Sequence, residues 1–142
     1  MHHYRKTRKE YSRLTRADNA SGLCAFCADV GLPQRAVEQT DTMYVIPNRT
    51  SYDMFEGLRV DEHLMVIPKR HVETLDDFTD QEKLEAMSIA GNYEKQGYSV
   101  YSRGVGSITR SVNHQHTHLI KLRNVRTRIF FFIRKPHILI DR

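Results

Sequence analysis

Three histidines alternate along the segment His114-Gln115-His116-Thr117-His118. Side chains of a β-strand repeat every two residues, so a strand would present all three imidazoles on one face, about 7 Å apart. In a helix the same side chains would fan around the axis. An imidazole, with an ordinary pKa of about 6.5, is a competent nucleophile and proton carrier near neutral pH. We therefore take this row as the candidate catalytic centre, with a row of hydrogen-bonded core histidines as the alternative.

Two cysteines, Cys24 and Cys27, are the only ones in the chain and are separated by two residues. This spacing supplies half of a tetrahedral zinc site, which needs two further nitrogen ligands. His63, His71 and the histidine row contain the candidates. Such a site would tie the N-terminal segment to the rest of the domain. Two thiols without a metal, or a dithiol redox pair, are the alternatives.

The elements that would position these residues point to an α+β fold. We expect strands over residues 35–39, 42–46, 64–67, 99–103, 112–122 and 128–133, and a loop over 48–62. Thr79 and Glu82 have the spacing of a capping box, which predicts a helix that ends at Gly97. Its buried face is expected to carry Leu84, Met87, Ala90 and Tyr93. Because strands outnumber the one long helix, the predicted fold is an antiparallel sheet with a helix packed on one face.

The length of 142 residues suits one domain, and both ends are strongly basic although the net charge of the chain is only +5. Residues 1–21 hold six Lys or Arg against two acidic residues, and residues 119–142 hold seven against one. We expect a basic N-terminal arm over 1–21, with a short amphipathic helix, and a single domain over 22–142. Basic ends attract phosphate-bearing ligands and nucleic acid, and a solvated arm is the alternative. Without an apolar run of membrane length or a signal core, we expect a cytoplasmic protein that does not contact membranes.

Three motifs together resemble the histidine triad (HIT) superfamily. The segment His114–Ile120 is similar to the family's alternating histidine signature, and His63–His71 is similar to a strand that precedes it. Cys24 to Cys27 lies where the zinc-containing branch carries its CxxC motif. The resemblance covers residues 24–122 in the family's order and implies a HIT-like antiparallel sheet. It also implies a nucleotidyl hydrolase or transferase that cleaves the α-phosphate bond of nucleoside phosphoramidates or dinucleoside polyphosphates.

The same resemblance assigns roles to single residues. His116 would attack the α-phosphorus and carry a nucleotidyl-histidine intermediate. His63 and His118 would line the phosphate site, where a protonated His118 could neutralise charge, and Ser111 would lie near the leaving group. A structural zinc ion (Zn²⁺) would be held by Cys24, Cys27, His71 and His114. Family members often dimerise, so the apolar segment Ile129–Ile133 is a candidate homodimer contact.

This sequence departs from the family pattern around the expected phosphate site. Gln115 is polar where the family is usually apolar, which indicates a hydrogen bond behind the row or a less buried strand. Arg103 and Arg110 are candidate phosphate ligands, with solvated loop charges as the alternative. Asn48, with Asp53 as a fallback, is the best match for the family's ribose-binding carboxylate. Two other functions stay open: processing of adenylated polynucleotide ends, and nucleotide binding by a zinc-stabilised module without catalysis.

Overall fold

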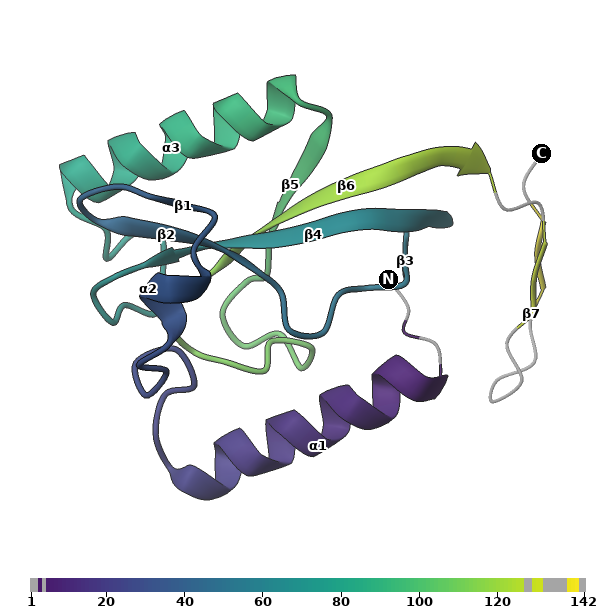
Figure 1. Cartoon of the computed structure of the whole chain (residues 1–142), viewed down its shortest axis with the longest axis horizontal. Coiled ribbons are helices and arrows are strands. Elements are labelled where there is room, and N and C mark those ends of the chain that lie inside the picture. Colours follow the sequence, from purple (N-terminus) through teal and green to yellow (C-terminus); the bar gives the residue numbers. More distant parts are fainter. Residues whose placement is uncertain (1–2, 4, 127–128, 132–137, 141–142) are drawn as a thin grey trace.

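A six-stranded sheet forms the centre of the computed structural model, which describes residues 3, 5–126, 129–131 and 138–140 (Figure 1). Its strands are β1 (Glu38–Gln39), β2 (Met43–Pro47), β3 (Met54–Phe55), β4 (Leu58–Pro68), β5 (Tyr98–Ser102) and β6 (Thr117–Arg126). They are ordered β1-β2-β4-β6-β5, β3 pairs with β4, and every pair is antiparallel. The predicted α+β class with an antiparallel sheet is confirmed.

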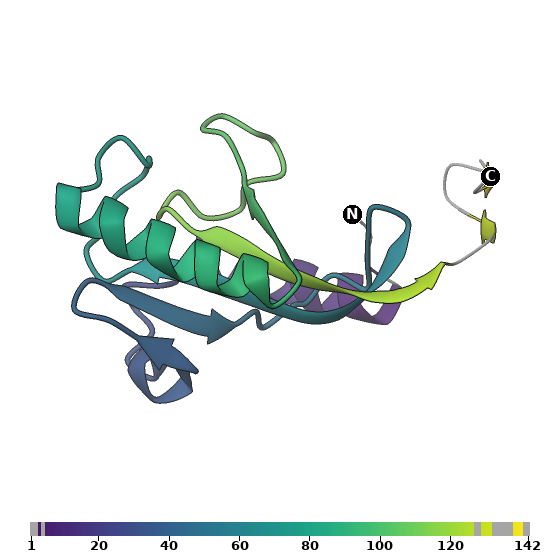
Figure 2. The same ribbon diagram turned by 90° about the horizontal axis from the view of Figure 1, so that it is seen from above.

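Two helices lie on opposite sides of the central strands, α3 (Asp80–Lys95) on one side and α1 (Arg5–Ser21) on the other (Figures 1 and 2). The predicted capping box of α3 is confirmed. The Thr79 hydroxyl accepts a hydrogen bond from the Glu82 backbone, and the Glu82 carboxylate accepts one from the Thr79 backbone. Beyond the helix, Gly97 has a positive φ of 87°, which ends the helical path as predicted.

The face of α3 that packs on the sheet differs from the predicted one. Leu84 and Met87 are 69% and 71% exposed and were wrongly predicted, whereas Tyr93 is buried as predicted and Glu82 is buried as well. The packed positions, 82, 86, 89 and 93, follow steps of four, three and four, which keep one helix face toward the core. The predicted stripe advanced by three residues at each step and therefore drifts around the axis. Burial of the Glu82 carboxylate is compensated by Arg70, whose Nη2 lies 2.8 Å from it.

The register between β4 and β6 places two histidines together. In this register His63 lies opposite Ile120, and Met65 lies opposite His118. Residues two apart on a strand share a face, so His63 and His118 are diagonal neighbours on the same face of the sheet. Strand β4 is buried from His63 to Pro68, so these rings meet away from bulk solvent.

The limits of several strands differ from those predicted. Leu32–Arg35 forms the short helix α2, so the first predicted strand is reduced to β1. The predicted loop over 48–62 contains β3 and the start of β4, joined by Glu56 and Gly57, both with positive φ. Such a two-residue hairpin turn needs positive φ at both positions, and glutamate gives little sign of it. Strand β6 begins at Thr117, so only His118 of the row lies within the sheet.

The last strands lie in a separate two-stranded sheet. Strand β7 (Ile129–Phe131) pairs with β8 (Ile138–Ile140) in an antiparallel arrangement. The predicted strand 128–133 also includes residues 128, 132 and 133, which lie outside the described residues. The homodimer contact through this segment stays a prediction.

Helix α1 occupies the segment predicted as a basic arm, and Gly22 follows it with a φ of 65°. Near its start, the Thr7 hydroxyl donates to Asp53 Oδ1 at 3.2 Å. The His3 ring lies between Tyr11 of α1 and Tyr52 of the loop before β3, with both centroid distances 5.4 Å. These contacts attach α1 to the loop between β2 and β3. None of the described helices has the length and apolar character that would let it cross a membrane.

Candidate functional site

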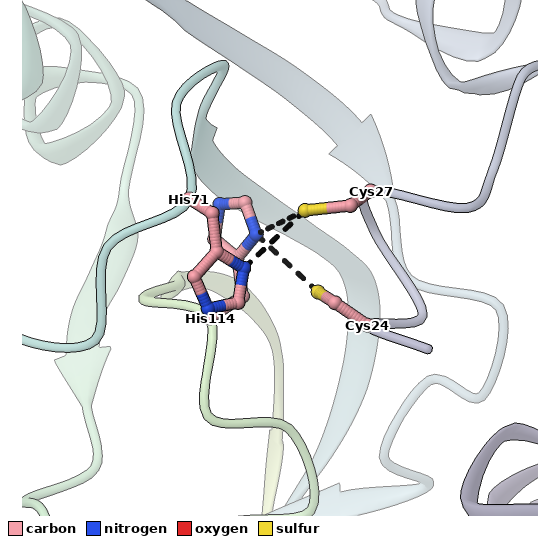
Figure 3. A group of neighbouring side chains, drawn as sticks. All are labelled: Cys24, Cys27, His71 and His114. Carbon is pink, nitrogen blue, oxygen red and sulfur yellow. Dashed lines mark hydrogen bonds between the residues drawn. The ribbon is translucent and has the colours of Figure 1, made fainter. Parts of the chain in front are cut away.

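Two cysteines and two histidines meet at one end of the sheet (Figure 3). Cys27 Sγ lies 3.3 Å from His71 Nδ1 and 3.5 Å from His114 Nδ1, and Cys24 Sγ lies 3.5 Å from the same His114 nitrogen. All four ligand atoms lie within 4.8 Å of one another. Around a tetrahedral zinc ion, with bonds of about 2.3 Å to sulfur and about 2.0 Å to nitrogen, sulfur and nitrogen are about 3.5 Å apart. The donor set and its spacing therefore fit a metal ion such as zinc.

The buried ligand candidate, His114, is oriented by a second hydrogen bond. Its Nε2 lies 3.0 Å from the carbonyl oxygen of Pro68, and a carbonyl can only accept, so Nε2 carries the proton. Nδ1 then directs its lone pair toward the two sulfurs, which is the arrangement that metal-binding histidines use. His71 follows the end of β4 and completes the group. His63, the other histidine weighed for this site, lies elsewhere.

His116 is held with one ring nitrogen free. Its Nδ1 lies 2.8 Å from the carbonyl oxygen of His114 and must donate, so in the neutral ring Nε2 carries the lone pair. The ring is only 7% exposed and makes an edge contact with Phe26, at a centroid distance of 5.5 Å. Burial lowers the pKa of His116 below its ordinary value, and the charges of Arg110 and Arg103 add to this effect. A neutral ring with an available nitrogen is what a nucleophilic histidine requires.

His63 and His118 form a directed chain of hydrogen bonds. The Tyr52 backbone N–H donates to His63 Nδ1 at 3.1 Å, so the proton of His63 is on Nε2. This Nε2 lies 2.8 Å from His118 Nδ1, which therefore accepts, and His118 carries its proton on Nε2. Among the residues that the structure describes, no acceptor lies within hydrogen-bonding distance of that buried Nε2. His118 thus offers one N–H donor, and its ring centroid is 5.1 Å from that of His116.

Both members of this chain are neutral at physiological pH. Burial lowers the pKa of His63 to about 3 and that of His118 to about 2, and the neighbouring histidines and Arg103 lower them further. In this structure His118 therefore offers a neutral N–H donor, and charge neutralisation by a protonated His118 stays a prediction. His63 is buried and contacts the cavity residue His118 through this hydrogen bond.

A cavity of about 720 Å³ opens over this face of the sheet. Its volume is typical of a site for a small molecule. Its lining includes His116, His118, Ser111, Asn48, Arg103 and Arg110, so six of the seven residues predicted to act on substrate share one cavity. Arg8, Tyr11 and Ser12 of α1 form another part of its wall.

Asn48 lies against the ring of His63. Its Nδ2 is 3.2 Å from His63 Nε2 and 3.5 Å from Nδ1. Near-equal distances to both ring nitrogens place the amide over the ring face, where an N–H group contacts the π-system. Asn48 Oδ1 accepts from the Thr50 backbone at 2.9 Å. The fallback residue Asp53 is engaged with Thr7 of α1.

The two candidate phosphate-binding arginines have different surroundings. Arg103 donates to the Tyr52 hydroxyl at 2.6 Å and lines the cavity. Arg110 donates to the backbone carbonyls of Glu73, Val112 and Asn113. Arg110 therefore holds the segment before the histidine row, which makes it a positioning residue as well as a nearby positive charge.

Gln115 is fully enclosed behind the row. It is 3% exposed, its Nε2 donates to the Ser102 hydroxyl at 2.9 Å, and its backbone N–H donates to Val72 at 2.7 Å. Of the two expectations for this polar residue, the hydrogen bond is confirmed and the lower burial is wrong. Its side-chain oxygen accepts from Arg110 at 3.3 Å, which links the row to that arginine.

Three contributions to the site were missed in the sequence. Tyr52 orders His63 and Arg103 from within a segment predicted to be a loop, where no periodicity marks it. Phe26 packs on both His114 and His116, and its place between the two cysteines was an available signal. The α1 wall of the cavity could not be foreseen, because helical spacing alone does not show what a helix covers.

Comparison with known proteins identifies the fold and the family. The model of the HIT domain family matches residues 33–125. A HIT family hydrolase from Clostridium thermocellum is 16% identical, with a TM-score of 0.53 over 75% of this chain and 96% of that chain. A hypothetical protein from Leishmania major is 18% identical, with a TM-score of 0.55 over 74% of this chain and 76% of that chain.

A histidine triad nucleotide-binding protein from Candida albicans is 19% identical, with a TM-score of 0.50 over 72% of this chain and 81% of that chain. No curated protein sequence matches. At these identities the solved structures establish the shared fold. The family match covers well over half of the chain and includes both the β4 strand and the histidine row. The chain is therefore a member of the HIT domain family.

Proposed function

We propose that this protein is a nucleotidyl hydrolase or transferase that uses His116 as its nucleophile. The observation that carries the proposal is the hydrogen bond from His116 Nδ1 to the carbonyl of His114, which leaves Nε2 with a free lone pair beside the cavity. The donor Nε2–H of His118 lies on the neighbouring ring. A nucleophile and a hydrogen-bond donor side by side are the two groups that displacement at phosphorus requires.

In the first step His116 Nε2 attacks the α-phosphorus, and the bond from phosphorus to the leaving group breaks. The ring then bears a positive charge, and its Nδ1–H donates to the His114 carbonyl in a charge-assisted hydrogen bond. The leaving group takes up a proton, for which the Ser111 hydroxyl in the cavity wall is the candidate relay: it donates its own proton and receives one from solvent in exchange. The His118 N–H supports a phosphoryl oxygen without changing its own charge.

In the second step water, or another acceptor, attacks the phosphorus of the nucleotidyl-histidine intermediate. The bond between phosphorus and Nε2 breaks, the attacking water loses a proton to solvent, and His116 returns to its neutral form. The lowered pKa of His116 favours this return. The products are a nucleoside monophosphate and the protonated leaving group.

We further propose that Cys24, Cys27, His71 and His114 hold a structural zinc ion. When bound, the ion would occupy a closed four-ligand shell and serve as a cross-link. His114 belongs to this group and also provides the carbonyl that orients His116, so the cross-link fixes the backbone that presents the nucleophile.

The proposal is tested by turnover of wild type and His116→Ala on three substrates: an adenosine phosphoramidate, a dinucleoside tetraphosphate and an adenylated oligonucleotide. Wild type is expected to release AMP and, after rapid quenching, to retain labelled nucleotide on the protein. His116→Ala is expected to lose turnover by about 10⁴-fold or more and to retain no label, because the attacking atom is gone.

Thr109→Ala serves as a matched control, since Thr109 lines the same cavity and has no role in the chemistry. If His116→Ala turns over at the wild-type rate, the nucleophile assignment is wrong. If neither protein acts on any substrate while both bind nucleotide, the chain is a binding module.

Action on adenylated polynucleotides is the second candidate, favoured by the exposed basic side chains of Lys9, Arg13 and Arg16 on α1. This function predicts binding of oligonucleotides that weakens steeply with salt. Affinity that is independent of salt would exclude it.

A further inference from the structure

One face of α1 is part of the active-site wall. Arg8, Tyr11 and Ser12 line the cavity that also contains His116 and His118. Positions separated by three and four residues share one face of a helix, so these side chains reach the cavity together. The match to the HIT domain family begins at residue 33, so α1 lies outside the segment that the family shares.

Contacts near the start of α1 hold this face in place. Thr7 donates to Asp53, and the His3 ring packs between Tyr11 and Tyr52. Tyr52 in turn contacts His63, with a centroid distance of 4.4 Å. The helix is therefore anchored beside the catalytic chain of hydrogen bonds.

The cavity has a large excess of positive charge. Its lining contains Arg8, Arg35, Arg49, Arg103 and Arg110, and Asp29 is its one acidic residue among those described. Asp29 is already paired with Arg35. A nucleoside phosphoramidate brings about one negative charge, whereas a dinucleoside tetraphosphate brings about four, one on each phosphate. The excess of positive charge in the cavity therefore suits a dinucleoside tetraphosphate better than a nucleoside phosphoramidate.

We propose that α1 selects substrates whose leaving group is a phosphate chain, and that Arg8 binds phosphates of that group. This inference rests on the proposed function and extends it by naming a residue that sets specificity. Among the described residues, none forms an ion pair with Arg8. Its guanidinium is suited to bidentate contact with phosphate oxygens. Ser12, one turn along the helix, adds a hydroxyl donor at the same wall.

The test compares Arg8→Ala with Arg13→Ala. Arg13 carries the same charge on the same helix but lies about 140° around its axis and does not line the cavity. The readout is the ratio of kcat/KM for a dinucleoside tetraphosphate to kcat/KM for an adenosine phosphoramidate. Arg8→Ala is expected to lower this ratio about tenfold, as loss of one charge-assisted contact implies. Arg13→Ala is expected to leave the ratio unchanged, and Arg8→Lys to restore part of it.

A titration with inorganic tripolyphosphate tests the same residue without turnover. Binding by calorimetry is expected to weaken at least fivefold in Arg8→Ala and to stay at the wild-type value in Arg13→Ala. Equal effects of the two substitutions, in either measurement, would overturn the proposal. If wild type cleaves neither substrate, the proposed function fails, and the titration still decides whether Arg8 binds a phosphate chain. If adenylated oligonucleotide is the best substrate and Arg13→Ala impairs it as much as Arg8→Ala, α1 serves nucleic acid instead.

Discussion

His63 and His118 each have one tautomer, set by a chain of hydrogen bonds that starts at the Tyr52 backbone. His116 is the opposite tautomer: its Nδ1 carries the proton and donates to the carbonyl of His114, so its Nε2 carries the lone pair. Adjacent rings therefore present a donor and a lone pair to the same cavity. In each imidazole, the hydrogen bond made by one ring nitrogen determines whether the other nitrogen is a donor or an acceptor. The alternating pattern of histidines in the sequence could not show these hydrogen bonds.

Burial of these rings makes the stability of the protein depend on pH. The pKa of His63 is lowered to about 3, so between pH 6.5 and pH 3 the unfolded chain binds a proton that the folded chain does not. The free energy of unfolding should therefore fall as pH decreases through this window, by up to about 1.4 kcal/mol per pH unit for this group. Urea unfolding at pH 7 and pH 5 measures the slope.

His63→Gln removes this titrating group. The free energy of unfolding of the variant should therefore change less between pH 7 and pH 5 than that of wild type. The comparison cancels the effect of protonating the cysteine and histidine cluster, which both proteins retain. Parallel slopes in wild type and His63→Gln would show that His63 titrates normally in the folded protein.

At the scale of elements, the candidate metal group joins three separate segments of chain. Cys24 and Cys27 precede α2, His71 follows β4, and His114 precedes β6. The pairing of the cysteines with His71 and His114 agrees with the resemblance, whereas spacing alone left His63 as an equal candidate. The register of β4 against β6 decided that point, because it directs His63 to His118.

We expect one equivalent of zinc per chain in protein purified without chelator, measured by elemental analysis. Removing it should lower the Tm by about 10 °C, which corresponds to about 3 kcal/mol in a chain of this size. Adding zinc should restore the Tm, and adding magnesium should not, because thiolate and imidazole ligands disfavour it.

His71→Ala should lower the Tm by a similar amount, because it removes one of the four candidate metal ligands. The His71 side chain is exposed, so its removal leaves no cavity in the core that could lower the Tm by itself. Well under one equivalent of metal, or a Tm that is insensitive to a chelator, would show that the four residues form a thiol–imidazole cluster only.

At the scale of the whole molecule, the sequence shows where basic residues are concentrated but does not show what they face in the folded protein. Composition showed a basic N-terminal segment, and the capping box and strand alternation gave the α3 helix and most of the sheet. The placement of α1 over the cavity depends on Thr7, Asp53 and Tyr52, which are far apart in the sequence and belong to no periodic pattern. Tertiary contacts of this kind lie beyond sequence-based reasoning with a single chain.

The cationic cavity should make substrate capture depend on ionic strength. Raising salt from 20 to 200 mM is expected to lower kcat/KM for a dinucleoside tetraphosphate several-fold, because screening shortens the reach of the arginine charges. An adenosine phosphoramidate, with about one charge, should respond less. Equal salt dependence of the two substrates would show that the field of the cavity does not guide binding.

Strand β6 begins at Thr117, so His118 lies within the sheet whereas His114 and His116 lie in the segment that precedes it. His118 pairs with Met65 on one side and Tyr101 on the other, so its release requires the sheet to open. The backbone from Ser111 to His116 precedes the strand and is tied by side chains such as Arg110. Local opening of that short segment would have to break the bond from the Gln115 N–H to Val72 and release His114 from the cysteine and histidine cluster, and it would carry away His116 while His118 stays in the sheet. If His116 acts as proposed, loss of activity on removal of the metal should therefore precede global unfolding.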